Sequence, residues 1–207
     1  GLMNLCVLPA GAAIFDPFCG SGTTLLEGYL NGHRSFGCDM NPLAAKIAKS
    51  KTGILDVNPD VVRDAVGTLV GRIENAPACP PCRREQFDKD CIDELLSWFP
   101  EPVLSKLNWL IGSIRSVSEG VIRDFLEVVL SSIIREVSQQ DPNDLRIRRR
   151  KEPVNDADVF QLYLDALDIQ YSRIEKFWSV RGYSPDRFKP CRVVEGDSRN
   201  ITTIDLL

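Results

Sequence analysis

The chain has 207 residues, 43% hydrophobic and 26% charged, which is the composition of an ordinary globular protein. A net charge of -4 gives no general attraction to nucleic acid, so such a contact would need a local basic patch. The apolar stretches are too short to cross a bilayer and no signal-peptide pattern opens the chain, so we expect no membrane contact. The seven cysteines, an odd number at irregular spacing, fit reduced thiols and predict a cytoplasmic location.

Strands and helices alternate in the first part of the chain. The predicted order is a strand at 12–15, a turn rich in glycine and proline at 17–22, a helix at 23–30, a strand at 35–38 and a helix at 42–51. Asp16 follows the first strand and Asp39 follows the second. Asn41 and Pro42 are an N-cap and a proline at the first helical position, so the second helix has a defined start.

The middle of the chain predicts helices that each have one apolar face. These faces are Val62, Val66, Leu69 and Ile73; Val103, Leu107, Leu110, Ile114 and Val117; Ile122, Phe125, Leu126, Val129, Ile133 and Val137; and Phe160, Tyr163, Leu167, Tyr171, Ile174 and Trp178. A polar stretch rich in proline and cysteine at 75–91 predicts a loop, and a polar, basic stretch at 138–153 separates the last two helices.

A pair of cysteines in the predicted loop, Cys79 and Cys82, has the spacing of half a zinc site. Structural zinc takes four ligands, and the chain's one histidine, His33, is far away in sequence. We interpret the segment as a plain loop without a metal and keep structural zinc as the alternative.

A third short strand is predicted at 192–195, followed by Gly196 and Asp197. The alternation of strands and helices predicts an α/β fold with a parallel, doubly wound sheet. The helices lie between its second and third strands in the sequence. We therefore expect three segments: a cofactor-binding Rossmann-like part at 1–75, a mostly helical insertion or capping region at 76–185, and a return strand at 186–207.

The turn between Asp16 and Thr24 is the strongest chemical signal. Gly20 and Gly22 allow the backbone to come close to a ligand, and the N-terminus of the following helix favours a negative group. Asp16 is able to accept hydrogen bonds from an ammonium group. A loop with both properties suits the amino-acid part of S-adenosylmethionine, and a glycine turn without a ligand is the alternative.

Asp39 ends the next strand, and an acid at that place accepts hydrogen bonds from two ribose hydroxyls in dinucleotide-binding folds. A surface carboxylate is the plain alternative. The physical argument does not separate a methyl donor from a nucleotide cofactor.

The segment Asp16 to Thr24, Asp-Pro-Phe-Cys-Gly-Ser-Gly-Thr-Thr, resembles the first motif of the DNA amino-methyltransferases, which methylate exocyclic amines of adenine or cytosine. Gly37 to Thr52 is similar to the second motif of a subset of that family, and Glu195 to Ser198 resembles the third. The resemblance implies S-adenosylmethionine as cofactor and DNA as partner, in a restriction-modification setting. It also implies a Rossmann-like methyltransferase sheet that is incomplete in this chain.

By this resemblance, the residues that bind the cofactor fall into three groups. They are Asp16, Phe18, Cys19, Gly20, Gly22, Thr23 and Thr24 around the methionine part; Asp39 at the ribose with Met40 on the adenine; and Asp197 with Ser198 flanking the adenine ring. Cys19 has no thiol chemistry to perform in methyl transfer to nitrogen, so we interpret it as a small space-filler in the loop.

The family's catalytic motif is Asp, Asn or Ser, then Pro-Pro and an aromatic residue, and we expect it soon after Asp197. The chain ends at Leu207 before such a motif, and its one Pro-Pro pair, Pro80-Pro81, is flanked by cysteines. We therefore predict no catalytic residue in the chain. We expect it to be inactive alone and to act with a C-terminal half or a second chain that carries the motif.

Five positive charges gather within six residues, at Arg146, Arg148, Arg149, Arg150 and Lys151. We predict that this basic run contacts DNA phosphates, with a solvated loop or pairing to nearby Asp141 and Asp144 as the alternative. Two other functions stay open for the whole chain: methylation of guanine amines in RNA, and a non-catalytic cofactor-binding or specificity subunit of a split enzyme.

Overall fold

The computed structural model describes residues 8–81, 89–144, 146–183 and 190–200. Within these ranges the chain has a mixed α/β fold with a three-stranded parallel sheet, and the predicted fold class is confirmed. No helix in the described ranges is long and apolar enough to cross a membrane.

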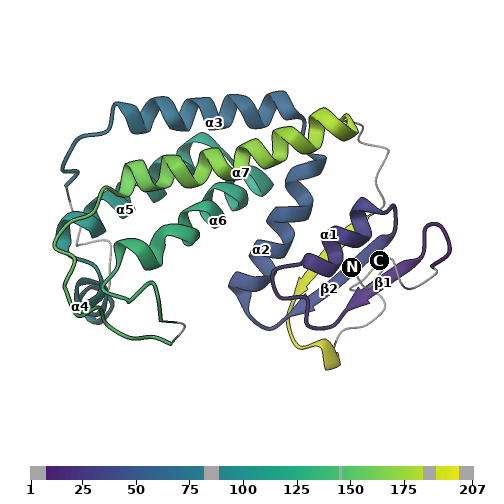
Figure 1. The fold of residues 1–207 in the computed structure, drawn as a ribbon, viewed down its shortest axis with the longest axis horizontal. Coiled ribbons are helices and arrows are strands. Elements are labelled where there is room, and N and C mark those ends of the chain that lie inside the picture. Colours follow the sequence, from purple (N-terminus) through teal and green to yellow (C-terminus); the bar gives the residue numbers. More distant parts are fainter. Residues whose placement is uncertain (1–7, 82–88, 145, 184–189, 201–207) are drawn as a thin grey trace. The chain divides into compact units, whose positions relative to one another are not determined.

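The sheet contains β1 (Ala13–Asp16), β2 (Arg34–Asp39) and β3 (Cys191–Glu195), in that order and all parallel (Figure 1). β2 is the central strand and pairs with both neighbours. Parallel strands end at the same edge, so the residues that follow these three strands gather at one edge of the sheet.

Two helices pack on this sheet, α1 (Thr23–Leu30) and α2 (Pro42–Gly53). The predicted start of α2 is confirmed, because the side chain of Asn41 accepts hydrogen bonds from the backbone N–H groups of Leu43 (2.9 Å) and Ala44 (3.3 Å). Leu25 of α1 and Ala48 of α2 are fully buried and share a core with Cys19, against which Cys191 and Val193 of β3 pack.

The remaining elements are a short 3-10 helix η2 (Ile54–Asp56), the helices α3 (Pro59–Glu74), α4 (Lys89–Trp98), α5 (Glu101–Val117), α6 (Gly120–Val137) and α7 (Val159–Arg181), and a second 3-10 helix η4 (Ser198–Asn200). The apolar faces predicted for α3, α5, α6 and α7 are mostly buried, with Leu69, Leu110, Leu126 and Leu167 almost completely so. Periodicity therefore located these helices because their burial follows the 3.6-residue repeat.

The loop predicted at 75–91 is wrong at its C-terminal end, where α4 begins at Lys89. Ile92, Leu95 and Leu96 have helical spacing, and Ile92 is buried. The proline- and cysteine-rich composition of the preceding residues masked this short helix. Residues 82–88 lie outside the described ranges.

The chain forms two compact units. One comprises Gly1–Val62, Gly120–Val128 and Ile174–Leu207, and the other comprises Arg63–Glu119 and Val129–Arg173. We call them the sheet unit and the helical unit. Three of their boundaries fall within α3, α6 and α7, and the fourth lies between α5 and α6. The three segments expected from the sequence stay a prediction.

Candidate cofactor-binding site

Three of the acids predicted at the site lie at or just after the ends of the three strands of the sheet. Asp16 and Asp39 are the last residues of β1 and β2, and Asp197 comes two residues after β3. The strand register places Asp16 opposite Gly37 and Asp39 opposite Glu195. The structure therefore brings these acids to the carboxyl edge of one sheet, where α/β folds bind ligands.

The glycine turn wraps tightly between β1 and α1. Gly20 and Gly22 have φ of 51° and 77°, in the left-handed region that favours glycine. The backbone N–H of Gly22 donates to the carbonyl of Cys19 at 2.8 Å, and the N–H of Phe18 donates to Oδ1 of Asp16 at 3.1 Å. A Cβ on Gly20 would meet nothing within 4 Å, so the space beside this residue is open.

The first turn of α1 offers backbone donors toward the same edge. Gly22 is its N-cap and provides no side-chain cap, and the turn carries no acidic side chain. Thr23 is exposed and Thr24 is half-buried at this end. Uncapped N–H groups and the helix dipole favour a bound anion at such a helix end. The contact with the methionine part of the cofactor stays a prediction.

Asp39 joins the glycine turn to the end of β2. Its Oδ2 accepts a hydrogen bond from the backbone N–H of Gly20 at 2.8 Å, and its Oδ1 accepts one from the N–H of Asn41 at 2.9 Å. A carboxylate has about four acceptor positions, so about two remain for further donors. These positions fit the two vicinal hydroxyls of a ribose.

Two large apolar side chains are exposed close to these acids in sequence. Phe18 in the glycine turn is 78% exposed, and Met40 directly after Asp39 is 69% exposed. Each large apolar side chain gains roughly 1.5–3 kcal/mol when it becomes fully buried. Their exposure fits residues that pack against the apolar parts of a ligand.

Asp197 is engaged with its own loop. Both of its oxygens accept hydrogen bonds from the guanidinium of Arg199, at 2.5 to 3.0 Å, and Oδ1 also accepts one from the backbone N–H of Arg199 at 3.0 Å. The guanidinium of Arg199 is the main cause that lowers the pKa of Asp197. Ser198, the other residue predicted at the adenine, begins η4 and is half-buried.

The side chain of Cys19 packs the glycine turn onto the core of the sheet unit. Its side chain is buried in the core, its N–H donates to the carbonyl of Cys38 at 2.9 Å, and its pKa is raised to about 11 by burial and then by the charges of Asp39 and Asp16. The thiol is therefore uncharged near neutral pH, which agrees with a space-filling role. Its backbone N–H and carbonyl are both bonded within the protein, and the predicted contact of Cys19 with a cofactor stays a prediction.

Sequence reasoning did not single out Cys38 as a site residue. Its thiol donates to the carbonyl of Gly196 at 2.9 Å, while the N–H of Gly196 donates to the carbonyl of Asp39 at 2.9 Å. These two bonds fix the chain just after β3, where Asp197 follows. Cys38 and Gly196 are 158 residues apart, so no local signal marks this pair.

The basic run belongs to the helical unit, whereas the three acids at the strand ends belong to the sheet unit. Arg149 and Arg150 make several contacts within the helical unit, whereas Arg146 and Arg148 pair only with Asp144 among the described residues. Lys151 is exposed. Arg149 is thus held by several contacts although it is exposed, Arg150 is held and half-buried, and the other three members of the basic run are exposed.

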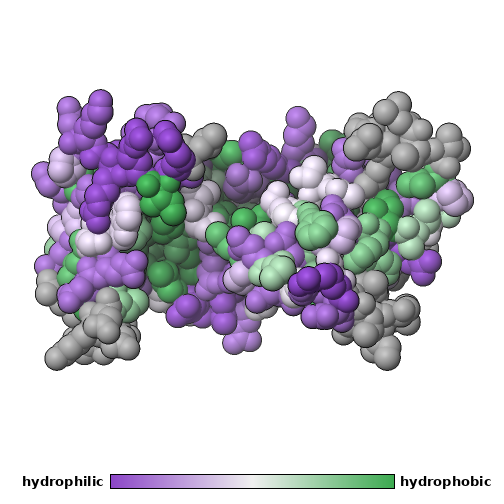
Figure 2. All heavy atoms as spheres, turned by 90° about the horizontal axis from the view of Figure 1, so that it is seen from below, coloured by the Kyte–Doolittle hydropathy of each residue, from purple (hydrophilic) through white to green (hydrophobic). Residues whose placement is uncertain are grey.

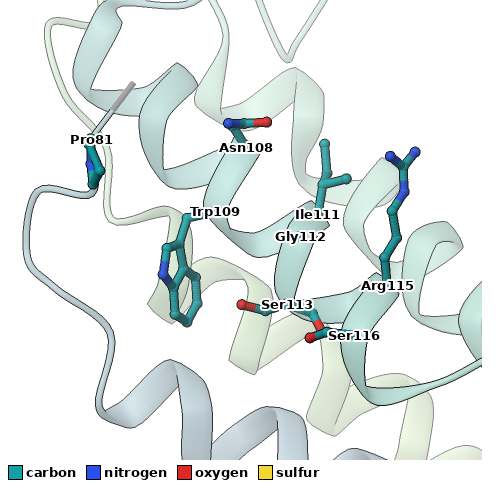
Figure 3. A pocket seen from close by; sticks show the side chains of 8 residues that line it. All are labelled: Pro81, Asn108, Trp109, Ile111, Gly112, Ser113, Arg115 and Ser116. Carbon is teal, nitrogen blue, oxygen red and sulfur yellow. The ribbon is translucent and has the colours of Figure 1, made fainter. Parts of the chain in front are cut away.

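The helical unit also contains a pocket of about 360 Å³ along α5 (Figure 3). Its lining includes Trp109, which meets Phe160 edge to face at 5.2 Å, and Ser116, which accepts a hydrogen bond from Arg72. None of the site residues predicted from the sequence lines this pocket. In the described ranges no three His, Cys, Asp or Glu side chains gather as metal ligands, and Cys82 lies outside those ranges.

Residues 1–65 match the family model described as RMKL-like, methyltransferase domain. The matched segment contains β1, α1, β2 and α2, which carry the glycine turn and Asp39. This part of the chain is thus similar to a methyltransferase domain, and the described residues have a Rossmann-like α/β fold.

Among curated proteins, the chain is similar to the Type II methyltransferase M.MvaI of Kocuria varians, with 28% identity over 144 residues. The alignment covers 69% of this chain and 31% of the relative, so the chain spans less than a third of that protein. No solved structure gives a significant match.

Proposed function

We propose that this chain is the S-adenosylmethionine-binding part of a methyltransferase that modifies an exocyclic amine of adenine or cytosine in DNA. The observation that carries the proposal is the position of Asp39. One carboxylate holds the glycine turn at Gly20 and the start of α2 at Asn41, and keeps acceptor positions for a ligand.

S-adenosylmethionine, when bound, supplies a methyl group on a positively charged sulfur. In our proposal its carboxylate lies at the first turn of α1, with Thr23 and Thr24, and its ammonium lies near Asp16. Asp39 accepts hydrogen bonds from the ribose hydroxyls. Phe18 and Met40, both exposed, then lose their contact with water when they pack on the ligand.

DNA as the target is supported by the long resemblance from Gly37 to Thr52 to DNA amino-methyltransferases. The similarity to a Type II methyltransferase supports the same choice. The exposed members of the basic run supply positive charge for phosphates in a chain of net charge -4.

Methylation of guanine amines in RNA is the second candidate. The family model that matches residues 1–65 also covers RNA methyltransferases, which is the observation in its favour. A third candidate is a non-catalytic cofactor-binding or specificity subunit, which would need a partner chain.

The test is cofactor binding by the Asp39→Asn and Asp39→Ala variants, measured by calorimetry with S-adenosylmethionine and its demethylated product. Loss of a charge-assisted hydrogen bond of roughly 1.5–3 kcal/mol predicts affinity lower by about 10- to 100-fold. Asp168→Ala, an exposed carboxylate on α7, is the matched control and should bind like the wild type.

Equal affinity of the wild type and both Asp39 variants would remove this residue from the site. Tighter binding of NAD than of S-adenosylmethionine would overturn the proposed function as a whole. Circular dichroism of each variant separates loss of the site from loss of the fold.

A further inference from the structure

After α6, residues 139–144 and 146–150 form a loop that is attached to the helical unit by its backbone. We call it the anchored loop. The N–H of Gln139 donates to the carbonyl of Trp98 at 2.8 Å. Within the loop, the N–H of Arg150 donates to Gln139 and the N–H of Asp141 donates to Arg148, both at 2.8 Å, so its two ends run side by side.

Arg150 holds the loop to the end of α6. Its Nε donates to the carbonyls of Ser138 and Gln140 at 3.0 Å each, and its Nη2 donates to the carbonyl of Glu136. A positive group at the C-terminus of a helix also complements the helix dipole. The guanidinium of Arg150 is therefore bonded to backbone carbonyls at and just after the end of α6.

Arg149 holds the loop to α4. Its guanidinium carbon lies 4.4 Å from the centre of the Trp98 ring, and its two Nη atoms donate to the carbonyl and hydroxyl oxygens of Ser97 at 2.7 and 3.2 Å. Cation–π stacking together with two hydrogen bonds fixes a long side chain in one place. Two of the five positive charges in the basic run are thus structural.

Three residues of the loop combine exposure with few contacts to the rest of the helical unit. The side chains of Arg146 and Arg148 are 78% and 62% exposed, and each lies 3.4 Å from an oxygen of Asp144. Between them in sequence, Ile147 is 81% exposed, more than any other exposed large apolar residue in the described ranges. Figure 2 shows hydrophilic side chains gathered at the upper left of the view.

We propose that the anchored loop inserts into a groove of duplex DNA, with Arg146 and Arg148 at the phosphates and Ile147 in apolar contact with the bases or sugars. The inference rests on the proposed function. It adds to the DNA contact an uncharged residue, Ile147, which a search for basic residues does not find. Single exposed apolar residues are common, but this one lies in a loop that is held by side-chain and backbone bonds.

Three physical arguments favour this partner. Arginine forms bidentate hydrogen bonds to phosphate. Both arginines that pair with Asp144 are exposed and lie 3.4 Å from it, so exchange of this weak pairing for phosphate costs little. The major groove admits a two-stranded ribbon, and apolar side chains meet thymine methyl groups there. A loop that is already held in place loses little conformational entropy when it binds.

The experiment measures binding of the 207-residue chain to a fluorescent 20-base-pair DNA duplex by anisotropy over a range of salt concentrations. Ile147→Ala should weaken binding by about fivefold to tenfold at every salt concentration, because an apolar contact releases no counterions. Arg146→Gln with Arg148→Gln should flatten the slope of log K against log salt by about 1.8, since each phosphate contact contributes about 0.9.

The matched controls are Ile169→Ala, an exposed isoleucine on α7, and Arg181→Gln, an exposed arginine at the end of α7. Both should bind DNA like the wild type. Ile147→Ala affinity equal to that of Ile169→Ala would overturn the role of Ile147, while the proposed methyltransferase stands.

Absence of duplex DNA binding would overturn the inference, and so would tighter binding to an RNA duplex of the same sequence. S-adenosylmethionine binding is measured on the same samples and should not change in any loop variant. Loss of duplex affinity with cofactor binding intact therefore separates failure of this inference from failure of the cofactor site.

Discussion

At the scale of the residue, Asp197 shows how a predicted ligand contact competes with a local one. The resemblance assigns Asp197 to the adenine of the cofactor, yet Arg199 donates to both of its oxygens. The side chain of Arg199 is 84% exposed, and exposed ion pairs are weak, so a ligand displaces it at small cost. We expect Arg199→Ala to raise the affinity for S-adenosylmethionine by about threefold, measured by calorimetry.

The control for this change is Arg192→Ala, an exposed arginine on β3 that makes no ion pair within the described ranges. It should leave cofactor affinity unchanged. If Arg199→Ala weakens binding instead, Arg199 itself contacts the cofactor and Asp197 serves to position it.

At the scale of the element, the packing of α1 on α2 depends on Gly22. Its φ is 77°, and a Cβ at this position would lie 2.8 Å from the Cβ of Ala48 in α2. Gly22→Ala therefore adds backbone strain and a steric clash between the two helices. We expect the free energy of unfolding to fall by about 2–4 kcal/mol, measured by urea denaturation.

Gly112→Ala provides a control of opposite sign. Gly112 is exposed in α5, and an added Cβ would meet nothing within 4 Å. Alanine should raise the free energy of unfolding by about 0.5–1 kcal/mol there, because glycine disfavours a helix interior. Stability of Gly22→Ala equal to that of the wild type would show that α1 and α2 adapt to the extra methyl group.

At the scale of the whole molecule, cofactor binding and catalysis are separate requirements. An exocyclic amine is a poor nucleophile because its lone pair is delocalised into the ring, so methyl transfer needs acceptors at that nitrogen and a pocket for the flipped base. The 207 residues contain no Asp, Asn or Ser followed by Pro-Pro and an aromatic residue. We expect no methyl transfer from labelled S-adenosylmethionine to duplex DNA by this chain alone.

Addition of a polypeptide that carries the Pro-Pro-aromatic motif should restore transfer, and the same polypeptide with the Asp39→Ala variant should restore far less. Turnover by the 207-residue chain alone would contradict the prediction. The groups that accept hydrogen bonds from the target amine would then lie among residues to which we give a structural role.

The sequence alone was enough for the order of strands and helices along the first part of the chain, the apolar faces of the long helices, and the turn at Gly20 and Gly22. These features depend on local periodicity, on glycine conformation and on a resemblance carried by contiguous residues. The sequence did not predict the short helix α4, because its apolar pattern is brief and follows a proline-rich stretch.

Only the tertiary structure decided which side chains meet. It gave the exposed Arg149 and the half-buried Arg150 several contacts with the helical unit, and it left Arg146 and Arg148 paired with Asp144 alone among the described residues, although the sequence shows one basic run. It also joined Cys38 to Gly196 across 158 residues. The physical reason is that burial and hydrogen bonding between distant segments depend on packing, which no local pattern of residue types encodes.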